Sequence, residues 1–216
     1  MPAPASSLAA FGAVLVLCAC DTSGARDTAE HDRAHPDDTS ESATPDACRW
    51  TTPLPATCVP TSPDGEGPYW RADAPERAAL NVADATGTRM FVAGRVLDSA
   101  CRPVAGVRVY LWSAGPDLTY DHLAADPNLY GYQTTAPDGT VCFETLRPLP
   151  YGPPEARLPA HFHVNVLDND VKRLTTQLRF TGDPYLGAGM DPRRIVTPEP
   201  LPDGSERVSY DFVLPP

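Results

Sequence analysis

Prolines interrupt this sequence along its whole length: 26 of its 216 residues are proline and 15 are glycine. A proline inside a helix removes a backbone hydrogen bond and clashes with the preceding turn, so frequent prolines disfavour long helices. Short strands joined by structured turns accommodate the same residues. With 42% hydrophobic residues, the chain still has enough apolar side chains to build a core. We therefore expect an all-β fold with long loops and little helix.

Segments rich in β-branched and aromatic residues recur between these turns, as expected for strands. They are 89–98, 106–114, two strands within 130–146 around the turn Pro137-Asp138-Gly139, the pair 160–168 and 174–183, and 207–214. Because several short strands at this spacing are typical of packed sheets, the pattern predicts a β-sandwich rather than a parallel α/β sheet. Residues 76–86 are expected to form one short helix.

The N-terminal region has the features of an export signal. Residues 8–19 are an apolar run too short to span a membrane but of the length of a signal-peptide core. The run ends in "LCAC", which resembles a bacterial lipobox, so we expect residues 1–20 to be a signal peptide with a lipid anchor at Cys20. Plain secretion with cleavage nearby is the alternative, and either case predicts an exported protein of the cell envelope or outside it. Residues 21–47 lack large aliphatic and aromatic side chains and predict a disordered acidic tether.

Four cysteines remain beyond this region: Cys48, Cys58, Cys101 and Cys142. An even number of cysteines in an exported chain indicates disulfides, and four cysteines allow three connectivities. We expect Cys48 to pair with Cys58, and Cys101 with Cys142. None of the four has the spacing of a thiol metal site or a redox motif.

Two histidines stand one residue apart in the stretch "LPAHFHVNV", residues 158–166. Successive side chains of a strand point to opposite faces, so His161 and His163 share one face while Phe162 and the valines share the other. Two imidazoles at this spacing can bind one metal ion. An isolated pair of this kind is also consistent with two solvated histidines on a wet strand face.

The histidine pair belongs to an ordered set of motifs. They are EGPYW (66–70), GRVLDSACRPVAGVRVYLWSA (94–114), GYQTTAPDGTVCFETLRPLPY (131–151), PAHFHV (159–164) and LTTQLRFTGDPYL (174–186). Together they resemble the intradiol ring-cleavage dioxygenases, the catechol and protocatechuate dioxygenase family, over most of residues 64–214. The resemblance implies a β-sandwich domain at 48–216, in agreement with the strand pattern.

The resemblance implies a non-haem Fe(III) bound by Tyr120, Tyr151, His161 and His163. Ferric iron favours anionic oxygen donors, and a tyrosine that ionises near pH ~10 is held as phenolate at neutral pH only by a strong Lewis acid. Zinc is the second choice, since it more often takes three histidines or a carboxylate or thiolate. Taken singly, each tyrosine is also consistent with a structural role, Tyr120 on a surface loop and Tyr151 packed beside prolines.

The resemblance also implies the reaction: a catechol-type ring is cleaved between its two hydroxylated carbons with dioxygen, giving a muconate-type diacid. In this scheme the substrate displaces Tyr151, which accepts one of its protons. Gln177 is implied beside the substrate ring, with an outward polar strand residue as the alternative. Leu158 stands where the family has an arginine. We expect Arg157 to reach inward in its place, with a surface charge as the alternative.

The second hypothesis is an exported β-sandwich that serves as a binding or structural module with a vestigial or non-catalytic metal site. The formal net charge of −11 argues against nucleic acid as a partner, because such a surface repels phosphate. The resemblance implies a catechol-type small molecule and dioxygen as partners, and we expect contact with the membrane only through the lipid at Cys20. The sequence carries no signal for an oligomeric state.

Overall fold

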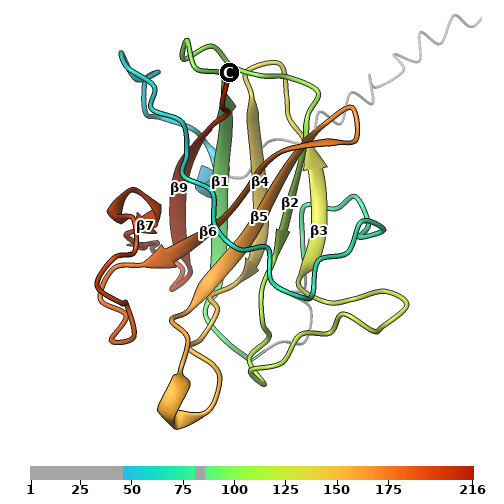
Figure 1. Ribbon diagram of the computed structural model, residues 1–216, viewed down its shortest axis with the longest axis vertical. Helices are drawn as coiled ribbons and strands as arrows, with labels where there is room; N and C mark the ends of the chain where they lie inside the picture. The colour runs from blue at the N-terminus through green and yellow to red at the C-terminus, as the bar shows by residue number, and fades with distance from the viewer. Residues whose placement is uncertain (1–45, 81–85) are drawn as a thin grey trace, which may run out of the picture. The chain divides into compact units, whose positions relative to one another are not determined.

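The computed structural model describes residues 46–80 and 86–216, which form two sheets (Figure 1). The expected signal peptide, and the expected tether up to residue 45, lie outside the described residues. One sheet has the order β4 (Thr140–Leu146), β1 (Arg89–Leu97), β9 (Glu206–Val213), β8 (Glu199–Pro200), and the other β3 (Tyr130–Thr134), β2 (Arg108–Trp112), β5 (His161–Asp168), β6 (Val171–Phe180), β7 (Ile195–Val196).

The helical content of the described ranges is limited to three short 3-10 turns: η1 (Asp46–Cys48), η2 (Pro154–Ala156) and η3 (Pro192–Arg194). No helix in these ranges is long and apolar enough to cross a membrane. The all-β prediction is confirmed, and the long loops between short strands are those expected from the proline content.

The helix expected at 76–86 is not present in its described part, and residues 81–85 lie outside the described residues. The backbone N–H of Arg77 donates to the carbonyl of Tyr132 in β3, and that of Leu80 donates to Glu144 in β4. These donors bond to neighbouring strands instead of to carbonyls one turn earlier, so the segment cannot wind into a helix. It therefore connects the edges of the two sheets.

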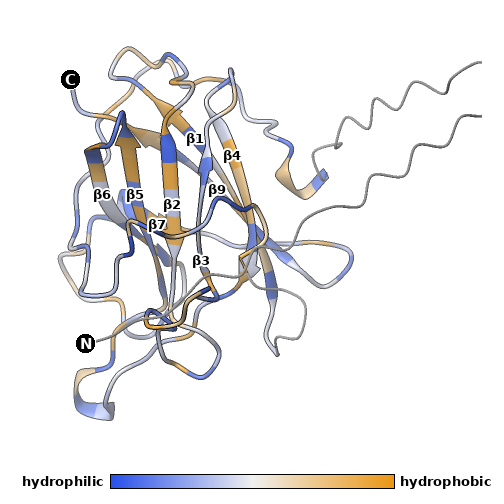
Figure 2. Cartoon of the chain, turned by 90° about the vertical axis from the view of Figure 1, so that its right-hand side faces the viewer, coloured by the Kyte–Doolittle hydropathy of each residue, from blue (hydrophilic) through white to orange (hydrophobic). Residues whose placement is uncertain are grey.

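The strands are largely hydrophobic (Figure 2), and their alternate side chains form the core between the two sheets. Phe162 and Val164 of β5 belong to the same buried cluster as Val92 of β1, Phe143 of β4 and Phe212 of β9. Each fully buried side chain of this size contributes roughly 1.5–3 kcal/mol through removal of its surface from water. The burial of Phe162 turns its neighbours His161 and His163 to the outer face of the five-stranded sheet.

The β5–β6 hairpin sets the register beside these histidines. Its turn contains only Asn169 and Asp170, which both have positive φ (47° and 65°), as tight hairpin turns of two residues require. Strand β6 consequently begins at Val171, three residues earlier than the sequence predicted. The resulting register places residue 177 opposite His163 and residue 179 opposite His161.

The disulfide prediction was wrong: the bonded pairs are Cys48–Cys142 and Cys58–Cys101. The reason is the path of residues 49–61, which run along the sandwich instead of folding back. The carbonyl of Arg49 accepts from Arg207 near the start of β9, and the N–H of Thr61 donates to Val213 at the end of that strand. Cysteines at either end of an extended segment cannot meet, so each pairs with a separate part of the domain.

Candidate metal centre and its cavity

The two histidines lie at the start of β5, on the outer face of its sheet, and each is 4% exposed. The segment that precedes the sandwich covers them, because Gly65 accepts a hydrogen bond from Gln177 and Glu66 accepts one from Asn165. A Cβ at Gly67 would lie 3.1 Å from Cε1 of His163, and its φ is +73°. Glycine is required there because it alone adopts this conformation readily while leaving room for the imidazole.

Four side chains converge at this place in a closed ring of donor atoms. The phenolic oxygens of Tyr120 and Tyr151 are 3.0 Å apart, and Nε2 of His161 and His163 are also 3.0 Å apart. Tyr120 Oη lies 3.0 Å from His163 Nε2, and Tyr151 Oη lies 3.4 Å from His161 Nε2. The convergence of the four predicted side chains is therefore observed, whereas their role as iron ligands stays a prediction.

Local structure positions each tyrosine. Tyr151 and Leu158 exchange backbone hydrogen bonds of 3.2 and 2.8 Å, so the loop through η2 returns Tyr151 to the start of β5. Tyr120 comes from the loop between β2 and β3, where its ring stacks on Tyr69 with 4.6 Å between centroids. Trp112 at the end of β2 pairs with His163 in the sheet and stacks on its ring at 4.9 Å. The rings of Tyr69 and Trp112 thus pack against Tyr120 and His163, respectively.

Burial keeps all four groups neutral. It lowers the pKa of both histidines, that of His163 to about 3 with a further contribution from His161. It raises the pKa of Tyr120 and Tyr151 above the ordinary value, and for Tyr120 the hydrogen bond that it donates to Tyr151 raises it further. A cation at the centre would favour the two phenolates, because nearby positive charge stabilises the ionised form.

The tautomer of His161 follows from its partner. Its Nδ1 lies 2.7 Å from the carbonyl oxygen of Pro159, which can only accept, so Nδ1 carries the proton. The lone pair of Nε2 is therefore directed to the ring of donors. A histidine fixed through its other nitrogen in this way is the usual arrangement of a metal ligand.

A cavity of about 240 Å³ opens beside the centre. Tyr151 and both histidines line it, together with Tyr69, Met190 and two residues of β6. Tyr120 does not line this cavity but borders another, of about 570 Å³, which is lined mostly by residues of its own loop. We take the smaller cavity as the ligand site because three of the four converging side chains face it.

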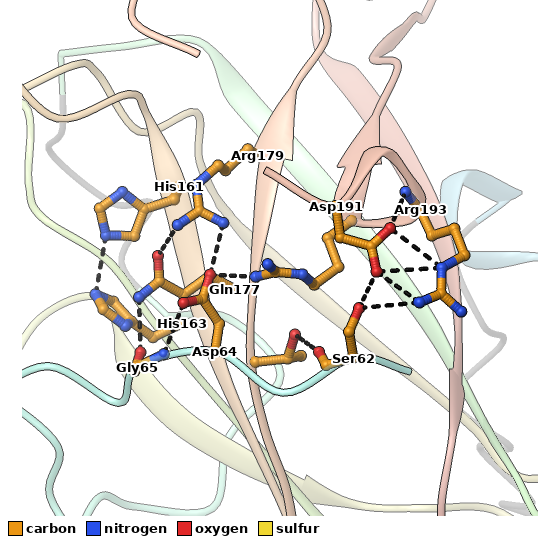
Figure 3. A network of polar contacts seen from close by, with 11 residues as sticks. Ser62, Asp64, Gly65, His161, His163, Gln177, Arg179, Asp191 and Arg193 are labelled. Carbon is orange, nitrogen blue, oxygen red and sulfur yellow. Dashed lines mark hydrogen bonds and ion pairs between the residues drawn. The ribbon is translucent and has the colours of Figure 1, made fainter. Parts of the chain in front are cut away.

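Gln177 lines the cavity from β6, so it is not a polar residue turned away from the site. Its Oε1 accepts a hydrogen bond of 2.7 Å from Arg179, and its Nε2 donates to the carbonyl of Gly65 at 2.6 Å. Arg179 also pairs with Asp64 at 2.8 Å (Figure 3). These contacts place the amide beside His163, its partner across the two strands.

Arg157 is not brought to the cavity, contrary to expectation. Leu158 lines the cavity, and in extended backbone the residue before it points the other way. The guanidinium of Arg157 lies instead over the ring of Tyr185, 5.9 Å from its centroid.

The arginine that does reach the cavity is Arg179, which the sequence analysis missed. The signal was the alternation of β6: Thr175, Gln177 and Arg179 share one face. An arginine two residues from a predicted site glutamine therefore had to face the same cavity. Asp64, which lies far away in the sequence, carried no comparable signal.

Comparison with known proteins decides the family. A family model described as "Dioxygenase" matches residues 65–216. A chlorocatechol 1,2-dioxygenase of Rhodococcus opacus is 33% identical over 150 residues, which are 58% of this chain and 58% of the relative. The chain belongs to the intradiol ring-cleavage dioxygenase family. A hydroxyquinol 1,2-dioxygenase of a Rhizobium species is 34% identical over 140 residues, 56% of this chain and 48% of the relative. The chain thus matches about half the length of these curated relatives.

Solved structures agree with this family assignment. The dioxygenase domain of a dioxygenase–carbohydrate-binding protein fusion from Streptomyces sp. SirexAA-E is similar with a TM-score of 0.63 at 31% identity, covering 72% of this chain and 98% of that one. The 3-chlorocatechol 1,2-dioxygenase of Rhodococcus opacus gives a TM-score of 0.65 at 24% identity, covering 71% and 72%. This second likeness shows the shared fold, the β-sandwich that the sequence predicted.

The donor ring fits the iron that the family implies. Around one ion with bonds of about 2.1 Å, ligands at right angles lie about 3.0 Å apart. Three of the four donor separations are 3.0 Å and the fourth is 3.4 Å. Two imidazole nitrogens and two phenolic oxygens also form the mixed set that suits ferric iron rather than the thiolate or carboxylate sets typical of zinc.

Proposed function

We propose that this protein is an iron-dependent intradiol dioxygenase that cleaves a catechol-type ring between its hydroxylated carbons with dioxygen, giving a muconate-type diacid. Tyr120, Tyr151, His161 and His163 would hold Fe(III). The observation that carries the proposal is the closed ring of their four donor atoms at the wall of a cavity. Bound there, ferric iron would supply the redox chemistry of ring cleavage.

The two tyrosines have different roles in this proposal. Tyr151 lines the cavity, whereas Tyr120 lies behind it, stacked on Tyr69 and hydrogen-bonded to His163. Of these two tyrosines, Tyr151 is therefore the one that faces a ligand in the cavity. As a phenolate it can accept a proton from a catechol hydroxyl at Oη and turn away, while Tyr120 stays in place.

The cavity size favours a single-ring substrate. A cavity of about 150 Å³ can hold benzene, so about 240 Å³ accommodates a catechol with small ring substituents. Pro68, Leu158 and Met190 contribute apolar surface to the wall for the ring, and Gln177 adds an amide to it. Simple and halogenated catechols, such as the one in the name of the Rhodococcus relative, are accordingly the first substrates to test.

We also propose that the protein is exported, with its lipid at Cys20. The two disulfides of the described domain support this, because such bonds persist in oxidising compartments and are rare in the cytosol. Membrane fractionation of cells that express the full chain, with mass spectrometry of the N-terminal peptide, tests it. A diacylglyceryl-modified Cys20 is expected, and an unprocessed N-terminus in the soluble fraction would contradict it.

The activity is tested with protein loaded with Fe(III) and a panel of catechols, following oxygen uptake and product together. One dioxygen is expected per ring cleaved, with both oxygen atoms from ¹⁸O₂ in the diacid. His163→Ala is the matched control, since it removes one donor from the ring and should abolish uptake. Iron-loaded protein that binds catechols without consuming oxygen would instead favour the binding module.

A further inference from the structure

Two buried arginines share one carboxylate at the edge of the cavity. Arg179 is 9% exposed and Arg194 is 8% exposed, and both donate to Oδ2 of Asp64. Burial alone would raise the pKa of Asp64, but the hydrogen bonds from Arg194 and Arg179 outweigh it and lower the pKa to about 2. Asp64 is therefore ionised at neutral pH, and the three side chains form a fixed cluster, which we call the Asp64 triad.

The Asp64 triad carries one positive charge in excess, since two guanidinium groups face one carboxylate. A buried charge without a partner is costly, so an excess of this kind indicates that an anion completes the site. Within the described residues, Nε of Arg179 is buried without a hydrogen-bond partner. The nearby carboxylate of Asp183 accepts from the backbone N–H of Ala160, so it is turned to the loop. Of the two arginines, only Arg179 lines the cavity.

Arg179 and the carbonyl of Gly65 together fix the orientation of the Gln177 amide. A guanidinium can only donate, so the amide must direct Oε1 to Arg179 and its NH₂ group to the carbonyl of Gly65 (Figure 3). One N–H of that group is already used, which leaves the other for a ligand in the cavity. Without Arg179 the Oε1 atom loses its donor, and only the hydrogen bond to the Gly65 carbonyl still holds the amide.

We propose that Arg179 is the cationic positioning residue of this site: anchored by Asp64, it fixes the amide of Gln177 and presents positive charge to an anionic catechol in the cavity. The inference rests on the proposed function. Arg179, on strand β6 next to β5, thus supplies the positive charge that was expected from Arg157. The register places Arg179 directly opposite His161, so the charge reaches the cavity although Leu158 occupies the loop.

The test compares methionine variants at three arginines, and a lysine variant at Arg179, in the full chain. Arg179→Met removes the charge and the amide contact. Arg194→Met removes the other buried guanidinium but leaves the contact between Arg179 and Gln177. Arg193→Met is the neutral control, because that side chain is 53% exposed and pairs with Asp191 outside the cavity. Melting temperatures establish that each variant is folded.

The first readout is binding of 4-nitrocatechol to Fe(III)-loaded protein without oxygen, followed by its absorption band. Arg179→Met should weaken binding about tenfold or more, as loss of a charged hydrogen-bonding group does, while Arg193→Met stays within about twofold. Arg179→Lys restores the positive charge but not the forked N–H donors of the guanidinium, so it should recover much of the binding. If Arg179→Met binds the probe as tightly as the wild type, the charge role is overturned.

The second readout needs no iron: the NMR signals of the Gln177 side-chain amide in metal-free protein. They should be sharp and protected from exchange in the wild type and in Arg194→Met, but broadened in Arg179→Met and in Arg179→Lys. Unchanged signals in Arg179→Met would overturn the positioning role. A wild type that takes up no iron or consumes no oxygen would refute the proposed function, and these amide signals would still decide the role of Arg179.

Discussion

Tyr120 and Tyr151 meet edge to face, with 3.0 Å between their phenolic oxygens, although 31 residues separate them in the chain. Burial raises the pKa of both, so neither ionises at neutral pH without a cation beside it. The two phenols also contact two buried neutral histidines. A trivalent ion bound among these four groups would stabilise both tyrosines as phenolates.

Tyr151→Phe should keep iron but lose most activity. Tyr120 and both histidines remain as donors, whereas the group that accepts a substrate proton is gone, which typically costs 10²–10⁴-fold. Tyr120→Phe, the matched variant, should bind iron more weakly because it removes the donor packed behind the cavity. Iron content and the visible spectrum check both, and equal behaviour of the two variants would contradict the division of roles.

Gly67→Ala should destabilise the protein by about 1–3 kcal/mol, because alanine is strained at a positive φ. Its Cβ would also lie 3.1 Å from Cε1 of His163, so iron affinity should fall as well. Gly65→Ala is the control, since a Cβ there has no atom within 4 Å. Urea unfolding and iron titration measure both effects, and identical results for the two variants would refute the role assigned to Gly67.

The metal-free protein should lose stability as the pH falls from about 7 towards 3. The unfolded histidines bind protons below about pH 6.5, whereas burial lowers the pKa of folded His161, and that of His163 to about 3. The unfolded state thus binds more protons in this range, at up to about 1.4 kcal/mol per pH unit for each histidine. Urea unfolding at several pH values measures the slope. His163→Gln should reduce it, and stability that is flat or rises on acidification would contradict the assignment.

The strands and the face of the histidine pair could be predicted from sequence because both depend on local alternation. Phe162 lies in the core and His163 on the outer face, as a period of two requires. The tyrosines were found through the order of motifs, since neither Tyr120 nor Tyr151 has a local signal that distinguishes a ligand from a packing residue. Their meeting depends on how two loops return to one end of a sheet.

What sequence could not supply depends on the tertiary path of the chain. The disulfide pairs follow from the extended course of residues 49–61, which no cysteine spacing reveals. The alternation of β6 pointed to Arg179, but only the hairpin register places it opposite His161. Asp64, which holds Arg179, is 115 residues away from it in the chain.

The disulfide Cys48–Cys142 should contribute more stability than Cys58–Cys101. The first spans 94 residues and the second 43, and a longer loop restricts the unfolded chain more, by about 0.7 kcal/mol here. Replacing each pair by serines and comparing unfolding free energies tests the order. Non-reducing digestion and mass spectrometry test the pairing itself, and a peptide that joins Cys48 to Cys58 would contradict it.

The most direct test of the four-donor centre is the visible absorption of the protein during titration with Fe(III) in the absence of oxygen. A charge-transfer band from tyrosinate to iron should grow to an end point at one iron per chain, and it should shift when catechol is added. Protein that binds iron without colour, or a band that survives the replacement of both Tyr120 and Tyr151, would contradict the centre described here.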